Sequence, residues 1–195
     1  RREQAAIPAQ PDPGRGRYSK SYFGADRYDN IMASSRGHSV PVVNGFEQVE
    51  GAAHGASNVV HAHDDAADRL RFEMAAAYPD EAGLASLERS VVFDRTVPGG
   101  QVRLNDSFAF AQAGGRFQSV LVTPLAVQTG AATVRIGDAG GGVLVEFDPA
   151  AVQVETEHHA GVEKQYAPSV DLTRVLFTAL GQGAAGEVAL QISPL

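Results

Sequence analysis

Short apolar segments that alternate with polar residues recur along most of the chain, and they constrain its fold more than any other feature. Leu70, Phe72 and Met74 are separated by single charged residues, which is the period of two expected of a half-buried strand. Comparable segments follow as far as 187–192, divided by Gly, Pro, Asn and Asp. The sequence therefore predicts an all-β fold, an antiparallel β-sandwich of roughly ten short strands. The only helix candidates, at 24–33 and 80–86, are weak.

Three stretches need separate interpretation. Residues 1–17 contain three Pro, two Gly and only one large apolar residue, so we expect a flexible N-terminal arm or linker there and a sandwich domain over 18–195. Residues 46–66 show little periodicity and predict a long loop. Residues 38–44 predict an edge strand, because Pro41 lacks a ladder donor, and Asn44-Gly45 is a strong turn signal.

Composition excludes several classes of function. The chain has 16 Lys and Arg against 23 Asp and Glu, a net charge of −7, which argues against nucleic acid and anionic lipid as partners. The absence of cysteine excludes a disulfide scaffold, a thiolate zinc site and a cysteine nucleophile. No apolar run approaches the ~20 residues of a membrane helix. The chain does not start like a signal peptide.

The histidines are the first candidates for chemistry. His38 stands at the head of the 38–44 strand, where it could be a metal ligand, a proton carrier or a structural residue. His61 and His63 would point to one side of an extended chain. With the adjoining Asp64 and Asp65 they could form a divalent metal site, or a polar loop that faces water.

Two further groups have simpler interpretations. His158 and His159 are neighbours in an expected strand and should point to opposite faces, so they are not a natural chelate. Arg27-Tyr28, together with Tyr22-Phe23, could form a sugar-binding face, because aromatic rings stack on sugar CH groups and Arg pairs with a carboxylate. These residues could equally anchor the first segment onto the sandwich. The sequence has no Gly-x-Ser-x-Gly motif and no phosphate-binding loop.

One set of motifs resembles a known family. Its most specific piece runs Gly37-His38-Ser39-Val40-Pro41-Val42-Val43-Asn44-Gly45, and Arg27-Tyr28 and Gln48 belong to the same segment. The pattern continues through Leu87-x-Arg89-x-Val91 and Leu104-x-Asp106-x-Phe108. Together these residues resemble the C-terminal β region of the heparinase II/III-like polysaccharide lyases.

This resemblance implies a fold, a reaction and a set of site residues. Family members combine an α/α toroid with a β-sandwich and cleave uronic-acid-containing polysaccharides by β-elimination. By resemblance, His38 is a metal ligand, with zinc as the common metal. Arg27, Tyr28, Asn44 and Gln48 are then candidates for binding substrate. A periplasmic or secreted location also follows from the family alone.

The chain departs from the family at its start. The family's His-x-His-x-Asp-x-Gly segment should precede His38, but the 37 residues before His38 contain no histidine, and no toroid is present. We therefore expect a β-domain that is not catalytically competent alone and contributes no catalytic residue. Its partner would be an acidic polysaccharide or its own missing α/α toroid domain. The alternatives are a carbohydrate-binding module and a structural interaction domain.

Overall fold

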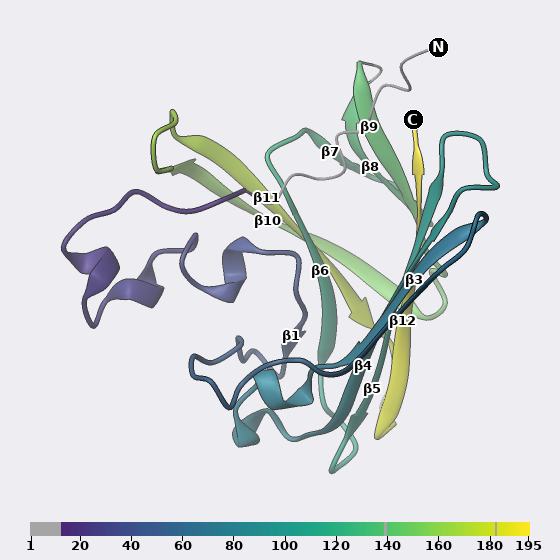
Figure 1. The fold of residues 1–195 in the computed structure, drawn as a ribbon, viewed down its shortest axis with the longest axis horizontal. Helices are drawn as coiled ribbons and strands as arrows, with labels where there is room; N and C mark the ends of the chain where they lie inside the picture. Colours follow the sequence, from purple (N-terminus) through teal and green to yellow (C-terminus); the bar gives the residue numbers. More distant parts are fainter. Residues whose placement is uncertain (1–12, 139, 182) are drawn as a thin grey trace.

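The computed structural model describes residues 13–138, 140–181 and 183–195, which form two antiparallel sheets packed face to face (Figure 1). The small sheet has the order β1-β6-β11-β10. Its strands are β1 (Val42–Val43), β6 (Phe117–Thr123), β11 (Val170–Ala179) and β10 (Val152–Val162). The predicted all-β sandwich is confirmed.

The large sheet has the order β2-β3-β4-β5-β12-β9-β8-β7. Its strands, in chain order, are β2 (Ser57–His63), β3 (Ala67–Glu73), β4 (Leu84–Asp94), β5 (Gln101–Phe110), β7 (Val127–Thr129), β8 (Thr133–Asp138), β9 (Gly141–Glu146) and β12 (Ala185–Pro194). Strand β12 pairs with β5 on one side and with β9 on the other. It therefore joins strands β2–β5 to strands β7–β9 in the middle of the sheet.

The helix candidates are only single 3₁₀ turns. These turns are η1 (Ser21–Phe23), η2 (Arg27–Asp29), η3 (Ser35–Gly37), η4 (Ala75–Ala77) and η5 (Asp80–Ala82). The candidates at 24–33 and 80–86 therefore shrink to η2 and η5, and the described part of the chain contains no α-helix.

The long loop predicted over 46–66 is wrong in its second half, where β2 pairs with β3 as the edge of the large sheet. All seven residues of β2 are exposed. A strand with both faces in solvent has no need of alternating apolar residues, which explains why its sequence gives no strand signal. The edge strand predicted over 38–44 forms only at Val42–Val43. The turn at Asn44-Gly45 is confirmed, with positive φ at both residues (50° and 80°), as a type I′ hairpin requires.

The small sheet is covered on both faces. Its inner face contributes Phe117, Leu121, Val175 and Phe177 to the main core against the large sheet. Side chains of the intervening positions point outward, because successive strand residues alternate between faces. This outer face of the small sheet carries a second apolar cluster, and the N-terminal residues cross over it (Figure 1).

Candidate functional site

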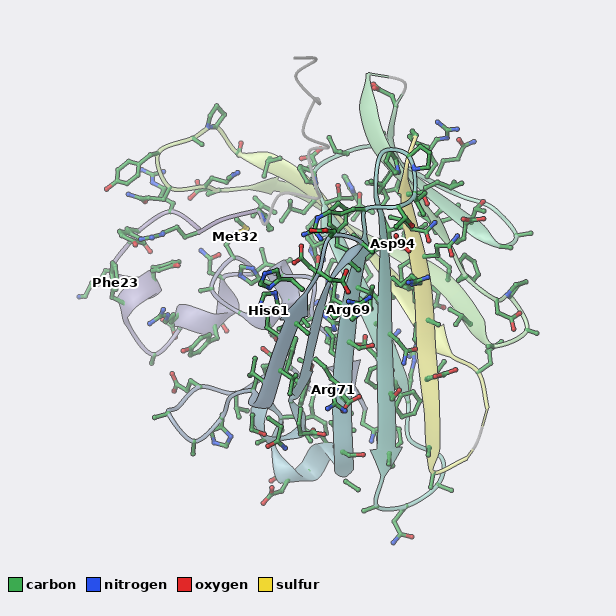
Figure 2. All side chains as sticks on the ribbon, turned by 45° about the vertical axis from the view of Figure 1, so that its right-hand side comes forward. Phe23, Met32, His61, Arg69, Arg71 and Asp94 are labelled. Atoms are coloured by element: carbon green, nitrogen blue, oxygen red, sulfur yellow. The ribbon has the colours of Figure 1, made fainter. Side chains whose placement is uncertain are left out.

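The segment 21–48, called here the N-terminal segment, contains His38 and the four proposed substrate-binding residues, and it lies on the outer face and at the edge of the small sheet. Ile31, Met32 and Val42 attach it through contacts with the second apolar cluster. Met32 is almost fully buried, whereas Phe23 is exposed at the outer edge of the segment (Figure 2). The N-terminal segment is therefore held on a rigid sheet while part of its surface stays open.

A pocket of about 460 Å³ opens between the N-terminal segment and β10. Its lining includes Tyr28, Asp29, Ser34, Arg36, Glu47 and His159. Arg36 and Glu47 form an ion pair across it, with 3.5 Å between Nε and Oε1. A guanidinium beside an aromatic ring in a polar pocket can hold a sugar carboxylate and its ring.

Arg27 and Tyr28 lie next to each other on η2. The Arg27 guanidinium lies 5.5 Å from the centre of the Tyr28 ring and 5.7 Å from that of Tyr22, within cation–π range. The Tyr28 hydroxyl donates a hydrogen bond of 2.7 Å to Glu50. This bond raises the pKa of Tyr28 above its ordinary value.

His159 is a pocket residue that the sequence assigns only to a strand end. It lies opposite Leu172 in the β10–β11 register, on the outer face of the small sheet. Its Nε2 is buried and has no hydrogen-bond partner among the described residues. Burial, and then the positive charges of Arg174 and Arg36, lower the pKa of His159, so the imidazole is neutral at pH 7.

Arg174 on β11 is a buried cation near His159, with a side chain that is only 4 % exposed. Its guanidinium pairs with Glu157, which lies directly opposite it on β10. His158 points away toward Asp171, 3.8 Å distant. The predicted divergence of His158 and His159 is therefore seen in the structure.

His38 ends η3 and begins the turn into β1. Its amide donates to the Ser35 carbonyl at 3.1 Å, and its own carbonyl accepts from Val40 at 2.9 Å. The next residue, Ser39, accepts a hydrogen bond of 3.0 Å from the Val122 amide on β6. Two local backbone bonds and the Ser39 hydroxyl therefore fix the position of His38 relative to the small sheet.

A buried ion pair lies beneath this turn. Arg89 on β4 and Asp106 on β5 are cross-strand partners. Arg89 binds the carboxylate in a bidentate manner, with Nε–Oδ1 and Nη2–Oδ2 distances of 2.6 and 2.8 Å. Its Nη1 also donates to the Ser39 carbonyl at 2.9 Å, and Ser119 donates to Asp106. The pair thus joins both sheets to the His38-Ser39 turn.

Asn44 and Gln48 do not line the pocket. The Asn44 side chain donates to the Ala82 carbonyl and accepts from the Arg116 amide, at 2.9 and 2.7 Å. Gln48 hydrogen-bonds to Tyr78, whose hydroxyl donates to the Pro41 carbonyl at 2.6 Å. Burial raises the pKa of Tyr78 far above its ordinary value. Both proposed binding residues therefore make contacts that stabilise the fold.

No group of three or more His, Asp and Glu residues that could hold a metal ion occurs in residues 13–138, 140–181 and 183–195. The rings of His61 and His63 stack at 5.7 Å, as expected for residues on one side of a strand. However, Asp64 and Asp68 pair with Arg69 and Arg95. A structural zinc site needs about four protein ligands, so the described residues alone do not fit a zinc ion around His38.

The helices of the described residues are all too short to cross a membrane.

No protein-family model and no curated protein sequence matches this chain. Its fold is similar to part of several solved lyases. The heparan sulfate lyase HepC from Pedobacter heparinus matches with a TM-score of 0.70 and 15% identity, over 95% of this chain and 28% of that chain. A solved heparinase III gives the same four values. The chain therefore has the fold of a segment that makes up little more than a quarter of these proteins.

Proposed function

We propose that this chain is the β-sandwich domain of a polysaccharide lyase that cleaves a uronic-acid-containing polysaccharide by β-elimination. The observation that carries this proposal is the match of 95% of the chain to 28% of a heparan sulfate lyase. The residues of the His38-Ser39 turn support it, because the motif that resembles the heparinase II/III-like family is the one held by the buried Arg89–Asp106 pair.

β-Elimination next to a uronate needs three groups. A base removes the C5 proton, a cation or hydrogen-bond donor neutralises the carboxylate, and an acid protonates the leaving oxygen. The C4–O bond then breaks and a C4–C5 double bond forms. We assign none of the acid and base roles to this chain. Their source would be the α/α toroid domain that the family resemblance implies, which is also the partner we propose.

The chain would contribute to substrate binding. Arg36 and Arg27 are placed to meet uronate carboxylates, and Tyr28 offers an exposed ring beside them. We propose Asn44 and Gln48 as support for this surface rather than as direct contacts, since their side chains bind the protein itself. We further propose a periplasmic or secreted location, as the family resemblance implies.

His38 would supply at most one ligand to a zinc ion. The other ligands would come from residues outside this chain, and no step of the proposed reaction uses the metal. Purified chain should hold less than one equivalent of zinc, before and after His38→Ala, when its metal content is measured by mass spectrometry.

The near-ultraviolet absorbance of unsaturated uronate tests the lyase proposal. A soluble polyuronide is incubated with this chain alone and with the longer protein to which we propose it belongs. Product is expected only from the longer protein. Product from the chain alone would contradict the assignment of the acid and base to another domain, and no product from the longer protein would contradict the lyase proposal.

A carbohydrate-binding module is the second candidate, and the polar pocket beside Tyr28 and Arg36 favours it. Such a module would bind an acidic polysaccharide without any cleavage by the longer protein. The same incubation, followed by a measurement of bound saccharide, distinguishes the two functions.

A further inference from the structure

The tip of the β10–β11 hairpin is held against the first described residues. Gly16 forms an antiparallel bridge with Lys164. On either side of it, the Arg17 amide donates to the Glu163 carbonyl at 3.3 Å, and the Gln165 amide donates to the Arg15 carbonyl at 3.0 Å. The hairpin projects beyond the sheets next to the N-terminal residues (Figure 1). These backbone hydrogen bonds hold the tip in place against residues 15–17.

Tyr166 is the unusual residue of this tip. Its side chain is 95 % exposed, more than any other large apolar or aromatic residue of the described part of the chain. Its backbone has φ of +61°, a left-handed conformation that bulky residues rarely adopt. A side chain this exposed adds little to the stability of the fold. Backbone strain of this kind is found most often at functional sites.

Two arginines lie in the segment that pairs with the hairpin tip. Arg15 donates a hydrogen bond of 2.6 Å from Nη1 to the Tyr18 hydroxyl, and this contact raises the pKa of Arg15, with smaller contributions from Tyr22 and Tyr166. The Arg15 guanidinium therefore contacts Tyr18 and lies within electrostatic range of Tyr22 and Tyr166. Arg17 pairs with Glu163 at 3.7 Å, and both side chains are about two-thirds exposed. An exposed ion pair of this kind is weak, so an anionic ligand can replace Glu163.

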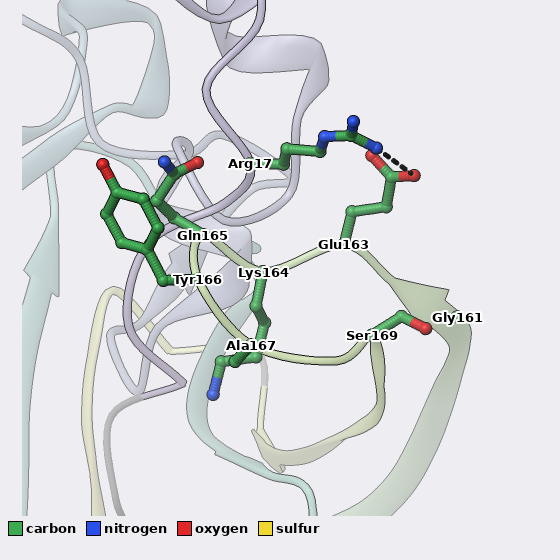
Figure 3. A pocket seen from close by; sticks show the side chains of 8 residues that line it. All are labelled: Arg17, Gly161, Glu163, Lys164, Gln165, Tyr166, Ala167 and Ser169. Carbon is green, nitrogen blue, oxygen red and sulfur yellow. Dashed lines mark ion pairs between the residues drawn. The ribbon is translucent and has the colours of Figure 1, made fainter.

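A pocket of about 450 Å³ lies at this tip, lined in part by Arg17, Glu163, Gln165, Tyr166 and Ser169 (Figure 3). Gln165 and Tyr166 extend to one side of the hairpin and Lys164 to the other, whereas the Arg17 guanidinium points toward Glu163 and away from the Tyr166 ring (Figure 3). Its lining among the described residues has one aromatic ring and no Leu, Ile, Val, Met or Phe. An aromatic ring beside polar and charged side chains suits the CH face and the charged groups of a sugar.

We propose that Arg15, Arg17, Tyr18 and Tyr166, called here the tip site, form a second binding site for an acidic saccharide. Tyr166 stacks on the CH face of one sugar ring, and the two arginines bind carboxylate or sulfate groups of neighbouring rings in the same saccharide. The tip site shares none of its lining residues with the pocket beside His159. The proposal of a tip site rests on the proposed function only in its choice of an acidic saccharide as the ligand.

Isothermal titration of the chain with three oligosaccharides tests the tip site. One carries uronates and sulfates, one uronates only, and one is neutral. Tyr166→Asn should weaken acidic binding roughly tenfold, the scale of a buried aromatic contact, whereas Tyr166→Phe should bind like the natural chain. Asn tolerates the left-handed backbone, so the fold is kept. The first two ligands show whether carboxylate suffices or sulfate is required.

Charge is tested with matched variants. Arg15→Gln and Arg17→Gln should each weaken acidic binding about as much as Tyr166→Asn. Arg71→Gln removes an equally exposed arginine, ion-paired with Glu88 on the large sheet, and should change binding less than about twofold.

Three results would overturn the tip site: no binding of either acidic oligosaccharide, equal binding by Tyr166→Asn and the natural chain, or the same loss in Arg71→Gln. Loss of binding in Tyr28→Ala alone would place the saccharide in the other pocket and so reject the tip site. None of these results affects the lyase proposal, which depends on the formation of unsaturated product.

Discussion

Replacement of Asp106 by alanine should destabilise the fold severely, because it removes one half of a fully buried ion pair. The carboxylate is 0 % exposed and the Arg89 side chain 8 %. Asp106→Ala removes two charge-assisted hydrogen bonds from Arg89 and one from Ser119, and leaves the guanidinium buried without its counter-ion. We expect a loss of about 3–5 kcal/mol in the free energy of unfolding. At about 2–4 °C per kcal/mol for a domain of this size, the melting temperature should fall by roughly 6–20 °C.

Urea unfolding followed by circular dichroism measures this loss, with Glu88→Ala as the matched control. Glu88 pairs with Arg71 across two strands, and both side chains are about half exposed. Its removal should cost less than about 1 kcal/mol. A double variant, Arg89→Met with Asp106→Leu, should regain most of the loss, because no charge is then left unpaired. If Asp106→Ala costs no more than Glu88→Ala, the buried pair does not join the sheets as described.

Three other variants test separate contacts. Tyr78→Phe leaves the Pro41 carbonyl without its donor and should lower the free energy of unfolding in urea by about 1–3 kcal/mol. A loss below about 0.3 kcal/mol would reject that contact. Asn44→Ala should be less stable than Asn44→Asp in the same assay, because alanine neither accepts from Arg116 nor tolerates φ of +50° well. Burial lowers the pKa of His159 below its unfolded-state value of about 6.5, so its neutral form contributes fully to stability above that value. This contribution is lost as the pH falls from there through the lower folded-state pKa. Urea midpoints between about pH 7 and pH 5 should therefore fall less in His159→Asn than in the natural chain, whereas His63→Asn, at an exposed position, should follow the natural chain.

The fold class could be predicted because the strands with one buried face carry alternating apolar residues. Phe72 and Met74 gave this signal for β3 and the residue after it, since they pack in or against the main core, whereas Leu70 in the same alternation is exposed. β2 could not be found in this way, because neither of its faces is buried. The segment 24–33 is only a weak helix candidate, because Gly, Asn and two Asp are among its ten residues. It is held by packing of Ile31 and Met32 on the small sheet and forms only a 3₁₀ turn.

The candidate site was predicted less completely. Arg27 and Tyr28 are adjacent in the sequence, so their proximity needed no knowledge of the fold. His159 reaches the same pocket through the β10–β11 register, which the sequence does not specify. Asn44 and Gln48 lie in the right segment, but their side chains bind Ala82, Arg116 and Tyr78, and only tertiary structure reveals such contacts.

The Arg89–Asp106 pair had a sequence signal of a different kind. Both residues stand inside the patterns that resemble the heparinase II/III-like family. However, a single Arg and a single Asp 17 residues apart do not by themselves predict an ion pair. Their pairing depends on the register of β4 against β5. The signal that could have led to it is the alternation, because Arg89 lies between Leu87 and Val91, and Asp106 between Leu104 and Phe108, on the apolar side of each strand. Charged residues are rarely buried unless they are paired.

The most direct test of the lyase proposal is the mass of the products that the longer protein releases from a polyuronide. β-Elimination adds no water, so each new non-reducing end should be an unsaturated uronate, one water lighter than the same end formed by hydrolysis. The account predicts these lighter products from the longer protein and none from this chain alone. Hydrolytic products, or no products from the longer protein, would contradict it.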